Sequence, residues 1–75
     1  MERRKHWWNS RWGRLSRRDV FISEDGGTWW VEVREGGSDG SSRWFELPHE
    51  DRALDCARDM IKVSGFDGWR EMPVG

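Results

Sequence analysis

The side chains best suited to bind a partner lie in residues 1–18, where cationic groups are interspersed with indoles. The stretch from residue 3 to residue 18 reads Arg-Arg-Lys-His-Trp-Trp-Asn-Ser-Arg-Trp-Gly-Arg-Leu-Ser-Arg-Arg. Guanidinium groups pair with phosphates, and indoles stack on nucleobases or lie at a membrane–water interface. The pattern therefore indicates nucleic acid or an anionic lipid surface as candidate partners. The plainer interpretation is a solvated basic tail that lies on the acidic remainder of the chain.

Residues with catalytic or metal-binding chemistry are few and far apart. His49 and Cys56 are seven residues apart on a predicted helix, which separates them by about 10 Å along its axis. A nucleophile and its base must lie within hydrogen-bond reach, so this pair is not a catalytic dyad. His6 adds one more ligand type, but three scattered groups do not make a metal site. We predict no enzyme active site, no metal site and no cofactor.

Length and composition restrict the chain to one small domain. A chain of 75 residues buries only about 60% of the surface that its unfolded form exposes, so the core must be thin. Cys56 is the sole cysteine, which excludes an intramolecular disulfide and suits a reducing compartment. No apolar run follows the basic start, so we expect no signal peptide and no transmembrane helix. We therefore expect a cytoplasmic protein, and a membrane is the partner that the sequence favours least.

The net charge of -1 conceals an uneven distribution along the chain. Residues 1–18 contain seven Arg or Lys residues against Glu2 alone, and residues 19–75 contain six against thirteen acidic residues. Such asymmetry bears on partners rather than on the fold.

Three short stretches predict strands. Val20 and Ile22 alternate with polar or aromatic neighbours over residues 19–23, and the same period of two continues over residues 28–35. Gly26 and Gly27 between them suit a tight hairpin turn. A glycine- and serine-rich loop then leads to a third short strand over residues 43–47.

The most secure predicted element is a helix over residues 48–64. Pro48 suits the first helical position, and Gly65 suits the position just after the end. The apolar residues of its inner face recur at helical spacing. We expect this face to meet the inner face of the sheet, so that the core consists of Val20, Ile22, Trp29, Val31, Val33, Phe45, Leu47, Ala53, Leu54, Ala57, Met60 and Ile61.

The predicted fold is of the α+β class: a three-stranded antiparallel meander packed on one C-terminal helix, with a flexible N-terminal arm. The arm occupies residues 1–15, the β-β-β-α domain residues 16–72, and a frayed tail residues 73–75.

The second face of the predicted sheet is unusually aromatic. Phe21, Trp30, Arg34 and Trp44 point away from the helix, and small soluble proteins rarely leave such a patch open. Three interpretations compete. In the first, tryptophans of the arm (Trp7, Trp8 and Trp12) fold over the face, and Arg34 lies on Trp44 as a cation–π pair. In the second, two copies pack sheet to sheet. In the third, the face stacks single-stranded nucleic acid, although its glutamates oppose phosphate.

The order of these segments resembles a known kind of DNA-binding domain. Arg-Asp-Val-Phe-Ile, Trp-Trp-Val-Glu-Val-Arg and Arg-Trp-Phe-Glu-Leu, followed by an alanine-bearing helix, look like the AP2 and integrase N-terminal type. The resemblance covers about residues 17–65, and it implies a sheet that enters the major groove. It also implies DNA contacts from Arg17, Trp30, Arg34, Arg43 and Trp44. The same strand-strand-strand-helix order resembles several short uncharacterised bacterial domains.

Taken together, these features indicate a small non-enzymatic interaction module that makes its contacts through the aromatic sheet face and the basic arm. The partner is another protein or a second copy, as a homodimer through the sheet face. The alternative is a nucleic-acid-binding protein that uses the arm, with or without the sheet. The candidate contact residues are Arg3, Arg4, Lys5, Trp7, Trp8, Arg11, Trp12, Arg17, Phe21, Trp30, Arg34 and Trp44.

Overall fold

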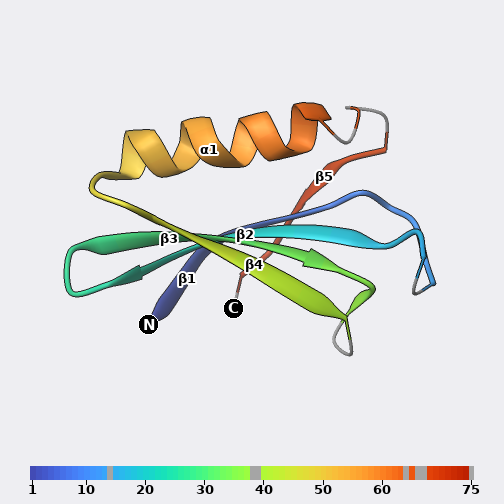
Figure 1. The fold of residues 1–75 in the computed structure, drawn as a ribbon, viewed down its shortest axis with the longest axis horizontal. Helices are drawn as coiled ribbons and strands as arrows, with labels where there is room; N and C mark the ends of the chain where they lie inside the picture. Colours follow the sequence, from blue (N-terminus) through green and yellow to red (C-terminus); the bar gives the residue numbers. More distant parts are fainter. Residues whose placement is uncertain (14, 38–39, 64, 66–67, 75) are drawn as a thin grey trace.

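The computed structural model describes residues 1–13, 15–37, 40–63, 65 and 68–74, and within these residues the chain forms five strands and one helix (Figure 1). In chain order the elements are β1 (Glu2–Trp8), β2 (Arg18–Asp25), β3 (Thr28–Glu35), β4 (Ser41–Leu47), α1 (Glu50–Val63) and β5 (Arg70–Met72). The strands form one antiparallel sheet in the order β4-β3-β2-β1-β5. The architecture is therefore α+β, as predicted.

Helix α1 lies along one face of the sheet and packs mainly on β2 and β3 (Figure 1). The core between the two layers is formed by Val20, Ile22, Val31, Val33, Ala53, Ala57 and Ile61. Trp29, Phe45, Leu47, Leu54 and Met60 pack around it and are partly buried. All twelve predicted core residues thus lie at this interface. Burial of each large aliphatic side chain contributes about 1.5–3 kcal/mol, so the thin core rests on a few β-branched residues.

The hairpin between β2 and β3 follows from its two glycines. Asp25 pairs with Thr28, which leaves Gly26 and Gly27 as a two-residue loop. Their φ angles are +60° and +91°, a conformation that a two-residue turn requires and that L side chains resist. This turn fixes the register of the two central strands, and with it the set of side chains on each face.

Residues 2–8 form β1 rather than the predicted flexible arm, and the sheet has five strands rather than three. Trp7 pairs with Val20 and packs against the core on the helix side. The register shifts between Arg3 and Lys5, which makes Arg4 the extra residue of a bulge. Because this bulge interrupts the alternation of residues, the stretch does not have the plain period of two that predicts a strand.

Helix α1 begins and ends close to the predicted positions. It spans Glu50–Val63 where residues 48–64 are predicted, and Ser64 lies outside the described residues. Gly65 has a φ of +85°, and its N–H donates to the carbonyl of Lys62 at 3.1 Å, as expected for a residue that ends a helix. The helix is not C-terminal, however, because β5 follows it and pairs with β1. The fraying predicted for residues 73–75 stays a prediction, and Gly75 lies outside the described residues.

Candidate interaction face

The face of the sheet opposite α1 is called here the helix-free face. The strand pairings place its residues in three rows: Asp19, Arg34 and Ser42; Phe21, Glu32 and Trp44; Ser23, Trp30 and Glu46. Phe21, Trp30, Arg34 and Trp44 therefore share one face, as the sequence predicts. The registers place Phe21 directly opposite Glu32, so Trp30 and Arg34 are its diagonal neighbours.

Half-buried Trp30 and exposed Trp44 form an aromatic pair on this face. The rings of Trp30 and Trp44 meet edge to face, with centroids 6.4 Å apart and an interplanar angle of 77°. Such a pair contributes about 0.5–1.5 kcal/mol beyond the area that it buries. Trp44 stays 48% exposed on the edge strand β4. A large ring that is held in place and still meets water is a feature typical of binding surfaces.

Phe21, at the centre of the face, is 3% exposed although no helix or strand covers it. His6 stacks on its ring at 4.2 Å between centroids. The guanidinium carbons of Arg3 and Arg34 lie 3.9 Å and 4.8 Å from the ring centroid. These are cation–π distances, and Arg34 makes this contact with Phe21 rather than with Trp44 as predicted.

The tryptophans of residues 1–15 do not provide the predicted cover. Trp7 faces the helix side, and Trp8 lies beside Trp12 with ring centroids 4.9 Å apart. The cover of Phe21 consists of His6 and Arg3 from β1 and Arg34 from β3. The first interpretation of the face is thus corrected in its residues, because His6 and two arginines take the place of the indoles.

Asp19 is buried on the helix-free face, with 2% of its surface exposed. Arg17 donates to it from Nε at 2.9 Å and from Nη2 at 3.3 Å, and Nε2 of His6 lies 2.6 Å from Oδ2. Burial alone raises the pKa of Asp19, but the hydrogen bonds from Arg17 and His6 outweigh burial and hold that pKa below its ordinary value. Asp19 is therefore a fixed anion that orients Arg17 and His6.

Glu32 is the second buried carboxylate, also 2% exposed. Nε of Arg34 donates to its Oε2 at 2.9 Å, and the hydroxyl of Ser42 donates to the same oxygen at 2.7 Å. Nη2 of Arg34 lies 2.8 Å from this oxygen as an ion pair. Arg3 lies 3.9 Å from its other oxygen. A buried carboxylate persists only when it is paired and hydrogen-bonded, and Glu32 meets both conditions.

Sequence reasoning places Asp19 and Glu32 on this face but does not predict that they are buried and paired, yet a signal for the pairing exists. Arg17 and Asp19 are two residues apart, and so are Glu32 and Arg34. Residues two apart on a strand lie on the same face, so each spacing places a cation beside an anion. In an interior strand, that pattern predicts a buried pair rather than a solvated one.

The loop between β1 and β2, residues 9–17, is ordered by Asn9, which is 8% exposed. Its side-chain amide donates to the carbonyl of Ser16 at 2.8 Å, and its side-chain oxygen accepts from the N–H groups of Arg11 and Arg18 at 3.2 Å and 3.1 Å. The indole N–H of Trp8 donates to the carbonyl of Arg11 at 3.2 Å. The loop is thus tied at both ends and along its length.

At the outer part of this loop, Trp12 is 74% exposed and Leu15 is 92% exposed. The guanidinium carbon of Arg17 lies 5.1 Å and 5.3 Å from the ring centroids of Trp8 and Trp12. Arg17 thus contacts both indoles at cation–π distance. The loop therefore holds two large apolar side chains in water.

Much of the basic character of residues 1–18 is neutralised within the fold. Arg4 lies 2.6 Å from Glu24 and Lys5 lies 3.3 Å from Glu71. From the sequence we expect the basic stretch to lie on acidic residues of its own chain, and Arg4, Lys5 and Arg17 do so. Arg11 differs, since it is exposed and in no ion pair within the part of the chain that the structure describes.

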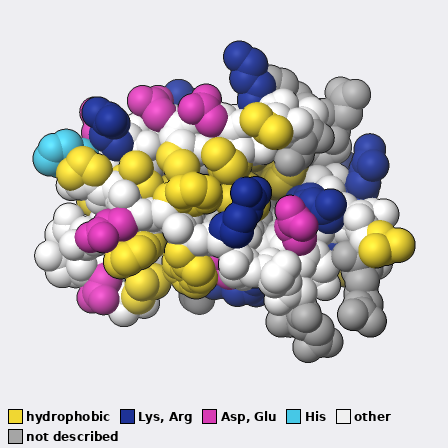
Figure 2. All heavy atoms as spheres, viewed as in Figure 1, with side chains coloured by type: hydrophobic (Ala, Val, Ile, Leu, Met, Phe, Trp, Pro, Cys, Tyr) yellow, Lys and Arg dark blue, Asp and Glu magenta, His cyan; other side chains and the backbone are white. Residues whose placement is uncertain are grey.

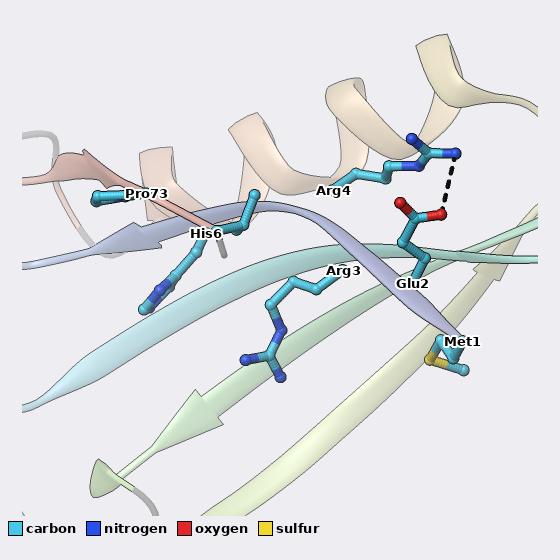
Figure 3. A pocket seen from close by; sticks show the side chains of 7 residues that line it. Met1, Glu2, Arg3, Arg4, His6 and Pro73 are labelled. Atoms are coloured by element: carbon cyan, nitrogen blue, oxygen red, sulfur yellow. Dashed lines mark ion pairs between the residues drawn. The ribbon is translucent and has the colours of Figure 1, made fainter.

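A pocket of about 580 Å³ lies between the start of β1 and the segment after β5. Figure 3 shows that Arg3 and His6 extend to the same side of β1, whereas Arg4 extends to the other side, toward Glu2. Pro73 borders the pocket (Figure 3). Its arginine and histidine side chains suit an anionic group, but both already have partners. Arg3 lies over Phe21 and near Glu32, and His6 stacks on Phe21 and is hydrogen-bonded to Asp19.

The remaining reactive residues lie apart from this face. Cys56 packs against the core, and burial together with the nearby Asp59 raises the pKa of its thiol. His49 and Arg43 are exposed, His49 just before α1 and Arg43 on β4. Among the described residues, no three His, Cys, Asp or Glu side chains come together as a metal site. Within the same residues, no helix is long and apolar enough to cross a membrane.

Comparisons of the chain with protein-family models, with curated proteins and with solved structures find no match. The resemblance to the AP2 and integrase N-terminal type therefore stays a prediction, and the function must be argued from the face itself.

Proposed function

We propose that this protein is a small non-enzymatic interaction module that binds a protein partner through the helix-free face, with Trp44 and Trp30 at the centre of the contact. The observation that carries the proposal is the 48% exposure of Trp44 while its ring is held against Trp30. Tryptophan is enriched among the residues that dominate binding energy at interfaces, and a rigid ring loses little entropy on binding. The neighbouring cationic cover supplies the arginines that such interfaces also favour.

Electrostatics favours a protein over a nucleic acid on this face. Arg17 and Arg34 each pair with a buried carboxylate at 2.8–2.9 Å, so their positive charge is largely compensated within the fold before a phosphate arrives. Glu46 lies directly opposite Trp30 and repels a phosphate backbone. An aromatic surface with balanced charge suits a partner that brings apolar groups and a mixed polar rim.

A photo-crosslinking experiment tests the proposal. A benzophenone amino acid placed at position 44 should capture a partner in cells of the source, whereas the same group at Arg58 on the outer side of α1 should not. Trp30→Ala should reduce the capture from position 44, because it removes the support of the Trp44 ring. Equal capture from both positions would show that the face has no special role. A product of twice the chain mass would identify a second copy as the partner.

One observation favours the alternative of nucleic-acid binding: exposed Trp12 is next to exposed Arg11, which is in no ion pair among the described residues. A base stacked on an aromatic ring contributes about 1–3 kcal/mol, and phosphate contacts add affinity that salt removes. Fluorescence anisotropy with single- and double-stranded oligonucleotides at low and high salt tests this alternative. Binding that disappears at high salt and in Trp12→Ala would support it, and no binding at low salt would exclude it.

A further inference from the structure

We propose that the loop of residues 9–17 docks on an anionic lipid surface, with Trp12 and Leu15 entering the headgroup region and Arg11 contacting lipid phosphates or carboxylates. This surface is separate from the Trp30–Trp44 pair, so the inference goes beyond the proposed protein contact. From the sequence, a membrane is the least favoured partner because the chain has no long apolar run. Interfacial docking needs no such run, because a few apolar side chains with adjacent cations suffice for reversible binding.

The apolar side chains of the loop are the first support. Trp12 is 74% exposed and Leu15 is 92% exposed, in a loop that the side chain of Asn9 binds through three hydrogen bonds. Gly13, between them, has a φ of +99°, which bends the chain so that the loop turns back at this point. Tryptophan prefers the membrane–water interface, where its ring is in an apolar layer and its N–H in a polar one.

The charges around the loop are the second support. No Asp or Glu occurs between Glu2 and Asp19 in the sequence. Arg11 is exposed and free of ion pairs in the described part of the chain, and Arg18, which is partly exposed, has a long ion pair of 3.9 Å with Glu35. Anionic lipids attract each such cation by about 1 kcal/mol near the surface, which corresponds to about fivefold in affinity.

The position of the loop is the third support. The molecule measures 34 × 23 × 21 Å, and the loop between β1 and β2 lies at one end of its longest axis (Figure 1). In the space-filling view, Lys and Arg side chains gather toward that end, and most of the visible Asp and Glu side chains lie toward the other (Figure 2). An anionic surface would therefore orient the molecule with the loop toward the lipid.

Shape and composition favour lipid over nucleic acid for this loop. Single-stranded nucleic acid is bound in cationic grooves or on platforms of several rings, whereas this loop projects from the end of the molecule. Leu15 has no ring on which a base could stack, but an aliphatic side chain gains from contact with acyl chains. The two exposed side chains together thus suit a soft apolar layer.

The test is cosedimentation of the full chain with vesicles of phosphatidylcholine alone and of phosphatidylcholine mixed with phosphatidylserine. We expect binding to the anionic vesicles and at least about tenfold less to the neutral ones, since several cations contribute. Trp12→Ala should weaken binding at least about tenfold, which is the expected effect of withdrawing a large apolar group from the interface. Arg11→Gln should weaken it about fivefold.

Matched controls separate the loop from general surface effects. Val63→Ala removes another exposed apolar side chain, and Arg58→Gln removes another exposed cation, both on α1. Neither should change vesicle binding. Leu15→Ser serves beside Trp12→Ala, because Leu15 is 92% exposed and its loss should leave the fold intact, as circular dichroism will show.

Three results would overturn the inference: no binding to anionic vesicles, equal loss in the loop and control variants, or binding of oligonucleotides through Trp12 without binding of vesicles. None of these concerns position 44, so the proposed protein contact can fail while lipid docking holds, and the reverse.

Discussion

Replacement of Arg34 by Met is expected to lower the free energy of unfolding by about 2–3 kcal/mol. The change removes the ion pair with Glu32 at 2.8 Å and the hydrogen bond from Nε at 2.9 Å, and leaves a carboxylate that is 2% exposed. Loss of one partner from a fully buried ion pair costs about 3–5 kcal/mol. The expected value is lower here, because Arg34 is 27% exposed and Glu32 keeps the hydroxyl of Ser42.

A double-mutant cycle isolates the pair. Glu32→Leu alone should cost about 1 kcal/mol, because Arg34 can then turn toward water. Glu32→Leu combined with Arg34→Met should cost no more than about 1 kcal/mol, since two apolar groups of similar size replace the pair. The coupling energy is then at least about 2–3 kcal/mol in favour of the native pair. Urea unfolding followed by tryptophan fluorescence measures all four proteins.

Arg43→Met is the matched control, because Arg43 is exposed on the neighbouring strand β4. Its effect should stay within about 0.5 kcal/mol. If Arg34→Met costs no more than this control, Glu32 reaches water in the native protein, and the account of the helix-free face as a surface built over buried carboxylates fails.

Three further outcomes follow from the same structure. Deletion of residues 1–8 should unfold the protein, because it removes a strand between β2 and β5; a dispersed amide spectrum of the shortened chain would contradict this. Because the folded-state pKa of Asp19 lies below its ordinary value of 3.8, its ion pairs stabilise the protein above pH 3.8, and this stability is lost as pH falls through the folded pKa. The urea midpoint should therefore decrease on acidification below that pH, and less in Asp19→Asn; an equal decrease in both proteins would show that Asp19 is not responsible. Asn9→Ala should cost about 1–3 kcal/mol through unsatisfied backbone groups and speed amide exchange in residues 10–17, and unchanged exchange would show that Asn9 does not order the loop.

The parts of the fold that the sequence predicts are those where apolar side chains repeat at one period. Val20 and Ile22, then Val31 and Val33, mark the central strands, and Ala53, Ala57 and Ile61 mark the helix. These residues are buried because they face one another, so the residues that make the sequence pattern are also the residues that form the core. The turn at Gly26 and Gly27 adds the register and therefore the composition of the helix-free face.

Strand β1 cannot be predicted from such a repeat of apolar side chains. It contributes one ring, Trp7, to the core, and the bulge at Arg4 breaks its alternation. Its place is decided by pairing with β2 and β5 and by ion pairs such as Arg4–Glu24, which join residues 20 positions apart. No local pattern reports such contacts, so a basic stretch that looks like a solvated tail forms an inner strand.

Within the part of the chain that the structure describes, some cations are paired with buried carboxylates and Arg11 is not, so binding at the two surfaces should depend differently on salt. Arg17 and Arg34 are held by buried carboxylates, so a partner that docks on Trp44 meets little free positive charge. Its affinity should therefore change little between low and physiological salt. Arg11 has no such partner among the described residues, so lipid binding through the loop should weaken steeply over the same range as the surface charge is screened. The two titrations use the same protein, with Trp44→Ala and Trp12→Ala as the respective controls. Equal salt dependence, abolished by the same variant, would mean that one surface performs both roles and that the division drawn here between sheet face and loop is wrong.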